Sequence, residues 1–274
     1  MMAPDIVGDE DLEQLLNEVA NVYGYDFTEY SKASIKRRIN RICLLDKHKS
    51  FAELRYKVLN DQSYLSRFIE EVTVNVTEMY RDPFFYKALR EKIIPKLGVN
   101  PYIKIWLAGC STGEEVYSIS ILLHEAKLAH KAIIYATDIN PTVLEKAKTG
   151  VFAINQMKLY TENYNNSGGS SDFSTYYSAN YDHVSFKEYL RKNVIFSTHN
   201  LASDRSFNEF QLIICRNVLI YFDKNLQDKV FNLFDASLEK LGYLALGSKE
   251  TIRFSHLNQT YKQVEKEKIW KKTR

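Results

Sequence analysis

The sequence predicts an α/β protein with a doubly wound, mostly parallel sheet, preceded by a small all-helical domain. Two patterns support this fold class. Apolar side chains recur at helical spacing through the first seventy residues, and after Pro101 short apolar runs alternate with amphipathic segments. Apolar strands separated by helices indicate a parallel sheet that is covered on both faces. The ligand of such a sheet is expected at the carboxyl ends of its strands.

The helical domain is expected over residues 1–72. A first amphipathic helix follows Asp9, a second covers SIKRRINRI, and a third begins at a capping box formed by Ser50 and Glu53. The apolar positions at helical spacing are Leu12, Leu15, Leu16, Val19, Tyr23, Ile35, Ile39 and Ile42.

Charge is distributed unevenly in this domain, although the net charge of the chain is only +3. Between Lys32 and Lys57 there are nine lysines and arginines but only two acidic residues. The basic helix around Arg37, Arg38 and Arg41 is therefore expected to face an acidic partner. A solvated basic face without a partner is the alternative.

Residues 73–98 are expected to form a linker and a connecting helix. Asp82-Pro83 is a strong helix start, so Asn75, Thr77 and Arg81 lie in the non-helical segment before it. Taken alone, these three polar residues are ordinary linker material.

The α/β domain is expected over residues 99–274. A Tyr-, Asn- and Ser-rich segment at about 155–191 is too long for an ordinary connection, which indicates an inserted sub-domain or a mobile excursion. The other expected elements are strands at IKIWLAG, AIIYATD, VIFST, QLIIC and YLALG, and helices from about Glu115 to Leu128, Pro141 to Lys148 and Leu226 to Leu241.

The first strand ends in a glycine turn, LAGCSTGEE at residues 107–115, which allows a ligand to approach the backbone closely. The spacing is not G-x-G-x-x-G, and Glu114 and Glu115 occupy the helix start where a pyrophosphate needs positive potential. This disfavours NAD, FAD and ATP. S-adenosylmethionine carries a sulfonium and an ammonium group but no phosphate, so it is compatible with acidic residues here. Alternatively, both glutamates only complement the helix dipole, contributing about 0.3 to 1 kcal/mol each.

Two further strand ends carry candidate ligand-binding residues. Asp138 ends the second strand, where a carboxylate can accept hydrogen bonds from both ribose hydroxyls, while Asn140 fits the cap of the next helix. Arg216 and Asn217 follow QLIIC. An arginine directly after a buried strand is costly unless it is paired or solvated, so it indicates a cleft, with a surface ion pair as the alternative.

Several protein classes are disfavoured. No run of about 18 apolar residues occurs and the segment from Met1 to Asp11 is acidic, so neither membrane insertion nor a secretory signal is indicated, and a cytoplasmic location is expected. Cys43, Cys110 and Cys215 lie far apart without metal-ligand spacing, which indicates unpaired thiols and no structural metal.

Four sequence blocks occur in order: VNVTEMYRDPFF, WLAGCSTGEEVYSIS, YATDINPTVLEKAKTGVF, and HNL followed by IICRNVLIYFDK. Together they resemble the chemotaxis protein methyltransferase (CheR) family, in which a helical domain precedes a class I methyltransferase domain. The sequence departs from the family pattern at Val116, where a proline is usual, and in LALGSKE, where a histidine often precedes the serine. Neither departure removes a matched contact.

The resemblance also implies roles for individual residues. Arg81 is the family's candidate for holding the acceptor carboxylate, and Tyr221 is a weaker candidate for lining the reaction site. Asp138 would bind the ribose, Asn200 and Leu201 would lie near the adenine, and Arg216 with Asn217 near the methionyl end. The implied cofactor contacts are Asn75, Thr77, Arg81, Glu115, Asp138, Asn200, Leu201, Arg216 and Asn217.

The activity implied by the resemblance is S-adenosylmethionine-dependent O-methylation of protein glutamates, with S-adenosylhomocysteine as product. The implied partner is the cytoplasmic helical region of a methyl-accepting chemotaxis receptor, and the segment at 155–191 corresponds to a small β sub-domain that docks a receptor tail in some members. Two alternatives remain open. A nucleic-acid methyltransferase would place the basic helix on phosphates, and a non-catalytic signalling module would bind the cofactor without turnover. Neither nucleic-acid binding nor membrane insertion is expected.

Overall fold

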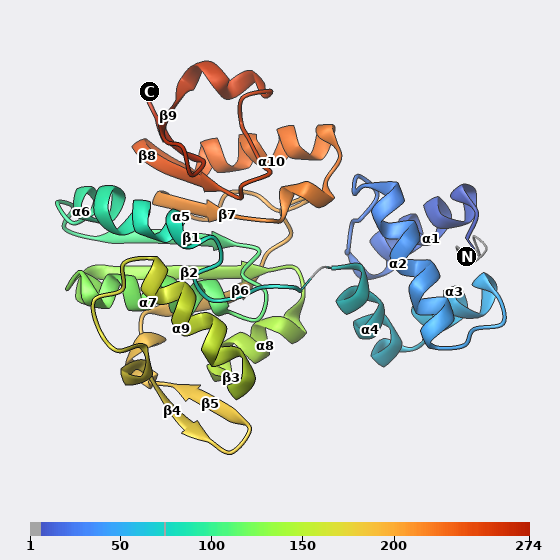
Figure 1. The fold of residues 1–274 in the computed structure, drawn as a ribbon. Coiled ribbons are helices and arrows are strands. Elements are labelled where there is room, and N and C mark those ends of the chain that lie inside the picture. The colour runs from blue at the N-terminus through green and yellow to red at the C-terminus, as the bar shows by residue number, and fades with distance from the viewer. Residues whose placement is uncertain (1–6, 74) are drawn as a thin grey trace.

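The computed structural model describes residues 7–73 and 75–274, and Figure 1 shows a cluster of helices beside a larger α/β domain. Three of the expected segments therefore fall partly outside the described residues. These are the acidic start from Met1 to Asp11, the helical domain at 1–72 and the linker at 73–98. Among the described residues, none of the helices is both long and apolar enough to span a lipid bilayer.

The helical domain packs around its own apolar core, in which Leu15, Val19 and Ile39 are completely buried. Ser50 accepts a hydrogen bond from the Glu53 amide at 3.3 Å, so the third helix begins where expected, although Glu53 itself accepts from the amide of Lys49 rather than that of Ser50. The helices described here are α1 (Asp9–Tyr23), α2 (Lys32–Leu45), α3 (Phe51–Asn60) and α4 (Gln62–Val72).

The central sheet has seven strands among the described residues, in the order β6-β2-β1-β7-β8-β10-β9. The first five in that order pair in parallel, and the last two pair antiparallel. The strands are β1 (Ile103–Ala108), β2 (Ala132–Asp138), β6 (Val194–Thr198), β7 (Phe210–Cys215), β8 (Leu238–Leu246), β9 (Tyr261–Glu265) and β10 (Ile269–Lys272). The expected mostly parallel sheet is confirmed.

Alternate residues of the central strands pack into different cores. Ile105 and Leu107 of β1 belong to one apolar cluster, and Trp106, which lies between them, belongs to another. Because successive side chains of a strand point to opposite faces, both faces of the sheet are covered, as the near-continuous apolar strands predict. The helices of this part are α5 (Pro83–Ala88), α6 (Ile94–Leu97), α7 (Glu114–Glu125), α8 (Pro141–Thr149) and α10 (Lys224–Ser237).

Two details of the expected elements are wrong. The helix expected to reach Leu241 ends at Ser237, because Leu238 already belongs to β8 and pairs with Phe210 of β7. Leu238 and Leu241 continue the helical spacing of apolar residues, so periodicity alone cannot locate this boundary. The helix expected to reach Leu128 ends at Glu125. The antiparallel strands β9 and β10 were not expected.

The segment expected at about 155–191 contains regular structure rather than a mobile excursion. Its helix α9 (Met157–Asn166) precedes β4 (Tyr177–Asn180) and β5 (His183–Phe186), which join β3 (Val151–Ala153) in a separate antiparallel sheet of order β3-β5-β4. Figure 1 shows this small sheet projecting from the edge of the α/β domain.

Main-chain hydrogen bonds join the helical domain to the segment of the α/β domain that follows β7. Tyr30 forms an antiparallel bridge with Phe222. On either side of it, the Ser31 amide donates to the Tyr221 oxygen at 2.8 Å, and the Asp223 amide donates to the Glu29 oxygen at 3.0 Å. Main-chain pairing therefore fixes the helical domain against the carboxyl edge of the sheet.

Candidate functional site

A cavity lies where the carboxyl ends of the parallel strands meet the linker and the helical domain. Its walls come from the loops after β1, β2, β6 and β7, from the linker before α5, and from the helical domain. Nine of the ten sequence-predicted site residues line it: Asn75, Thr77, Arg81, Glu115, Asp138, Leu201, Arg216, Asn217 and Tyr221. Residues from five separate parts of the sequence therefore converge on one space.

The glycine turn after β1 forms one wall of this cavity, and two of its glycines are structurally required. Gly109 has a φ of 80°, and a Cβ there would lie 2.4 Å from Cγ2 of Val218. Gly113 has a φ of 96°, and a Cβ there would lie 2.8 Å from Cβ of Ala147. Any larger residue would therefore be strained and would also collide with the loop after β7 or with α8.

Asp138 lies at the end of β2 and is buried. Its two carboxylate oxygens accept hydrogen bonds from the Ser111 amide at 2.9 Å and the Asn140 amide at 3.0 Å. Burial raises the pKa of Asp138 in spite of these bonds. Asn140 caps α8 as expected, accepting from the Thr142 amide at 2.9 Å. Because a carboxylate has about four acceptor positions, Asp138 can still accept bonds from a ligand.

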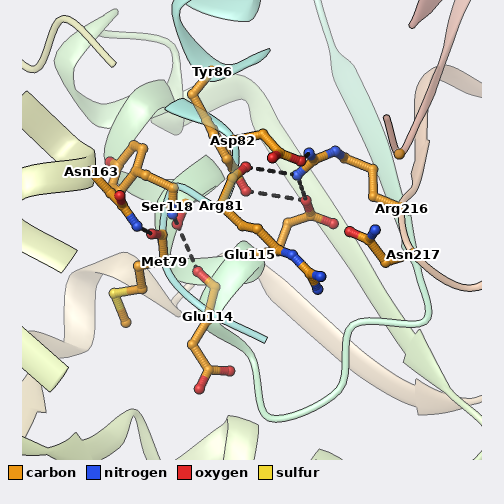
Figure 2. A network of polar contacts seen from close by, with 12 residues as sticks. Met79, Arg81, Asp82, Tyr86, Glu114, Glu115, Ser118, Asn163, Arg216 and Asn217 are labelled. Atoms are coloured by element: carbon orange, nitrogen blue, oxygen red, sulfur yellow. Dashed lines mark hydrogen bonds and ion pairs between the residues drawn. The ribbon is translucent and has the colours of Figure 1, made fainter. Parts of the chain in front are cut away.

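Arg216 follows β7 and lies between two carboxylates (Figure 2). Its Nη2 is 2.5 Å from Oδ2 of Asp82, and its Nη1 is 3.4 Å from Oε1 of Glu115. The side chain is only 4% exposed, so this is not the surface ion pair considered as the alternative. The guanidinium also lies 4.1 Å from the ring centroid of Phe85, at the start of α5. Arg216 thus joins the sheet edge to the linker.

The main chain around Arg81 is held in an uncommon conformation. Tyr80 and Asp82 have φ values of 53° and 59°, which non-glycine residues rarely adopt. The Tyr80 amide donates to Oγ of Ser118 at 3.0 Å, and the Arg81 oxygen accepts from Nη1 of Arg216 at 3.0 Å. Backbone strain of this kind persists only where the surroundings enforce it, and it concentrates at functional sites.

The two adjacent glutamates of the glycine turn have different surroundings. Figure 2 shows Glu115 directed toward Arg216 and Glu114 directed away from it. Glu114 is buried, and it accepts hydrogen bonds from the hydroxyls of Thr112 at 2.6 Å and Tyr160 at 3.4 Å. Burial raises the pKa of Glu114. Only Glu115 lines the cavity, so only Glu115 can contact a ligand there.

Asn200 is the one predicted residue that the structure does not bring into the described lining of the cavity. Its side-chain oxygen accepts from the Ala202 amide at 2.9 Å, within its own loop. The neighbouring His199 lines the cavity instead. Since His199 belongs to the HNL block, the sequence contained a signal at this position, one residue away from the prediction.

Glu250 is a structural part of the site that sequence reasoning missed. This buried carboxylate accepts hydrogen bonds from the amides of Asn217, Val218, Leu219 and Gly247, at 3.0, 2.9, 2.8 and 2.6 Å. It fixes the loop after β7, in which Asn217 has a φ of 61°. Burial raises the pKa of Glu250 against the effect of these bonds. Nothing in LALGSKE distinguishes a buried glutamate from a surface one.

The helical domain also contributes to the cavity, which the sequence did not reveal. Tyr30 and Val72 line it, next to Thr73 at the start of the linker. Arg38 of α2 lies with its guanidinium 5.7 Å from the ring centroid of Tyr221. The cavity is therefore completed by both parts of the chain.

A family model described as "CheR methyltransferase, SAM binding domain" matches residues 75–269, and one described as "CheR methyltransferase, all-alpha domain" matches residues 10–73. A Pseudomonas putida protein named putative methyltransferase Cher3 is 44% identical over 97% of both chains. Chemotaxis protein methyltransferases of Borreliella burgdorferi and Listeria innocua are 33% and 31% identical, over 89% and 92% of this chain and 89% and 93% of theirs. These matches confirm the resemblance carried by the four sequence blocks.

Proposed function

This chain belongs to the CheR methyltransferase family, and we propose that it transfers the methyl group of S-adenosylmethionine to glutamate side chains of a methyl-accepting chemotaxis receptor. The product would be a glutamate methyl ester. S-adenosylmethionine is the cofactor of the family, whose model for residues 75–269 is a SAM-binding domain. The observation that carries the proposal is the cavity in which the predicted cofactor residues meet Arg81.

The charges around the cavity suit a positively charged methyl donor. Glu115 and Asp138 are carboxylates in its lining, and the charge of Arg216 is offset by Glu115 and Asp82. A sulfonium and an ammonium group are stabilised by nearby carboxylates, whereas phosphates would be repelled by them. We propose that Asp138 binds the ribose hydroxyls, that Leu201 lies near the adenine and that Glu115 lies near the methionyl end, with Asn75, Thr77 and Asn217 completing the contacts. We also propose that Asn200 lies near the adenine, because it belongs to the same loop as Leu201 and its side chain holds that loop through the Ala202 amide.

The proposed reaction is an in-line displacement at the methyl carbon. The acceptor carboxylate forms a carbon–oxygen bond as the carbon–sulfur bond breaks, and the sulfur keeps the electron pair of the broken bond. A glutamate with an ordinary pKa of about 4.3 is already ionised at neutral pH, so no general base is required. An anion and a cation become two neutral products, which a site that excludes water favours. The protein's contribution is then mainly the geometry of approach.

Arg81 is proposed to orient the acceptor carboxylate. It lines the cavity, and its Nη1 donates to the Val76 oxygen at 3.1 Å, which leaves other donors of the guanidinium for a carboxylate. Its main chain is held by Arg216 and by the contact of Tyr80 with Ser118. Tyr221 lines the same cavity and is proposed to border the reaction site.

We propose that the acceptor segment of the receptor approaches along α2. Arg38 of this helix lies over the ring of Tyr221 in the cavity. Arg37 is exposed on this helix, while Arg41 pairs with Glu71 of α4. An acidic helical segment of a receptor would complement the exposed charge of α2. Since the relatives from Borreliella burgdorferi and Listeria innocua are named chemotaxis protein methyltransferases, we propose a cytoplasmic location and a chemotaxis receptor as the partner.

The proposal is tested by incubating the protein with S-adenosylmethionine carrying a radiolabelled methyl group and with receptor-bearing membranes. Methyl esters of carboxylates are hydrolysed by mild base, so the label should be released as volatile methanol. Label that resists base would contradict glutamate esterification and indicate methylation of nitrogen or nucleic acid. Cofactor binding with no transfer to any carboxylate acceptor would favour the non-catalytic module.

A further inference from the structure

Tyr30 reaches the donor cavity from the helical domain, although no sequence block of the methyltransferase domain includes it. It lines the cavity together with Asp138, Leu201 and Phe222. Asp138 and Leu201 are the residues proposed for the ribose and the adenine. Tyr30 therefore lies beside the adenosine half of the proposed donor, and it approaches that half from the other domain.

The aromatic ring of Tyr30 is fixed by packing on both domains. Its centroid is 5.1 Å from that of Phe27 and 4.7 Å from that of Phe222, and both pairs meet edge to face. The main chain of Tyr30 is fixed as well, through the bridge with Phe222. The ring cannot turn away from the cavity without breaking these contacts, so its position is set before any ligand binds.

The hydroxyl of Tyr30 is available to a ligand. Within residues 7–73 and 75–274, no protein group forms a hydrogen bond with it. Burial, together with the negative charge of Asp138, raises the pKa of the phenol, which keeps it protonated at neutral pH and able to donate. A phenol near a carboxylate that already accepts two main-chain bonds can share a sugar hydroxyl with that carboxylate.

We propose that Tyr30 binds the adenosine half of S-adenosylmethionine, with its hydroxyl hydrogen-bonded to the sugar beside Asp138. This inference rests on the proposed function. The consequence is that the donor bridges the two domains, because Tyr30 belongs to the helical domain and Asp138 to the sheet. Donor binding and the seating of the helical domain would then reinforce each other.

The substitution Tyr30→Phe tests the hydroxyl alone, because phenylalanine keeps the ring that packs on Phe27 and Phe222. Loss of one neutral hydrogen bond should weaken S-adenosylhomocysteine binding by roughly threefold to tenfold in calorimetric titration. The unfolding midpoint of the unliganded protein should stay the same, since none of the described residues forms a hydrogen bond with that hydroxyl. Equal affinities of Tyr30→Phe and the wild type would overturn the inference.

Tyr25→Phe is the matched control. Tyr25 lies in the same loop and stacks on Phe27 with a centroid distance of 6.4 Å, but it is not among the residues that line the cavity. Its substitution should leave S-adenosylhomocysteine affinity unchanged. An equal loss in both variants would show that the loop responds to any change in polarity, which would overturn a direct contact by Tyr30.

A shorter ligand locates the contact on the donor. 5′-Methylthioadenosine has the adenosine half without the amino-acid half, so Tyr30→Phe should weaken its binding by the same factor. A loss seen with S-adenosylhomocysteine but not with 5′-methylthioadenosine would place Tyr30 at the methionyl end and contradict the inference. If the wild type bound neither ligand, both the proposed function and this inference would fail, whereas wild-type binding with unchanged Tyr30→Phe affinity overturns only the inference.

Discussion

The guanidinium of Arg216 donates a hydrogen bond from its Nη1 to the main-chain oxygen of Arg81, and these two atoms are 3.0 Å apart. Arg216 follows β7, whereas Arg81 lies in the linker 135 positions earlier. The bond attaches the linker to the sheet edge without using the side chain of Arg81. The guanidinium of Arg81 can therefore be removed while its place in the fold is kept.

Arg81→Ala should lower methyl transfer by roughly hundredfold, because misplacing an acceptor within a site costs about that much. The affinity for S-adenosylhomocysteine should change far less, since Asp138 and Glu115 remain. Single-turnover transfer and calorimetric titration measure the two effects separately. Lys87→Ala, on the exposed face of α5, is the control for a lost positive charge nearby. Equal losses in transfer and affinity would show that Arg81 only binds the cofactor.

Gly109→Ala should destabilise the protein and weaken donor binding. Its φ of 80° disfavours any side chain, and the added Cβ would collide with Val218. Gly24→Ala is an informative control, because Gly24 has a similar φ of 77° with nothing within 4 Å of an added Cβ. In thermal unfolding, Gly24→Ala should lower the free energy of unfolding by about 1 kcal/mol through backbone strain alone, and Gly109→Ala should lower it by more. Similar costs at both sites would mean that the loop after β7 moves away freely.

Glu250→Gln should lower the free energy of unfolding by about 1 to 3 kcal/mol. The carboxylate of Glu250 accepts hydrogen bonds from main-chain amides, and the NH2 group of a glutamine would face these amides without being able to accept from them. Donor binding should weaken too, since the loop carrying Arg216 and Asn217 loses its anchor. Glu145→Gln, at an exposed position of α8, should have little effect on either measurement. Denaturant unfolding with and without S-adenosylhomocysteine gives both quantities. An unchanged unfolding free energy would contradict the anchoring role.

Glu114 should make stability depend on pH. Burial raises its pKa above the ordinary value of 4.5, so the folded protein binds a proton that the unfolded chain has already released. Stability therefore falls as pH rises from about 4.5 to the raised pKa, and the cost of the buried charge stays at higher pH. Glu114→Gln removes this titration. The unfolding free energy of the variant should fall less steeply across that window than that of the wild type, and identical slopes would rule out the effect.

Arg37→Ser should weaken methylation of receptor membranes without changing affinity for S-adenosylhomocysteine, because Arg37 is exposed on α2 and does not line the cavity. The difference in methylation rate between the wild type and Arg37→Ser should shrink at high salt, because salt screens the attraction between the wild-type Arg37 and the receptor. Lys96→Ser, on α6 at the far side of the α/β domain, controls for loss of one exposed charge (Figure 1). Steeply salt-dependent RNA binding that is lost in Arg37→Ser would instead favour a nucleic-acid methyltransferase.

The strand ends were predictable from the sequence because each candidate residue follows an apolar run directly. Asp138 ends β2 and Arg216 directly follows β7, and because both strands pair in parallel with β1, their carboxyl ends lie at the same edge of the sheet. Tyr30 and Glu250 were not predictable in this way. Tyr30 is an aromatic residue in a loop of another domain, and the burial of Glu250 depends on contacts with residues 33 positions earlier. Local patterns contain no information about such long-range contacts.

The anchoring of the loop after β7 also affects the order in which the site can assemble during translation. A nascent chain that ends before Glu250 contains the glycine turn, Asp138 and Arg216, but the amides of Asn217, Val218 and Leu219 have no carboxylate to bind. β8, which pairs with β7, also emerges late. The donor pocket can therefore mature only after Glu250 has left the ribosome, and a proteolytic cut that removed β8 and Glu250 would disable it from a distance.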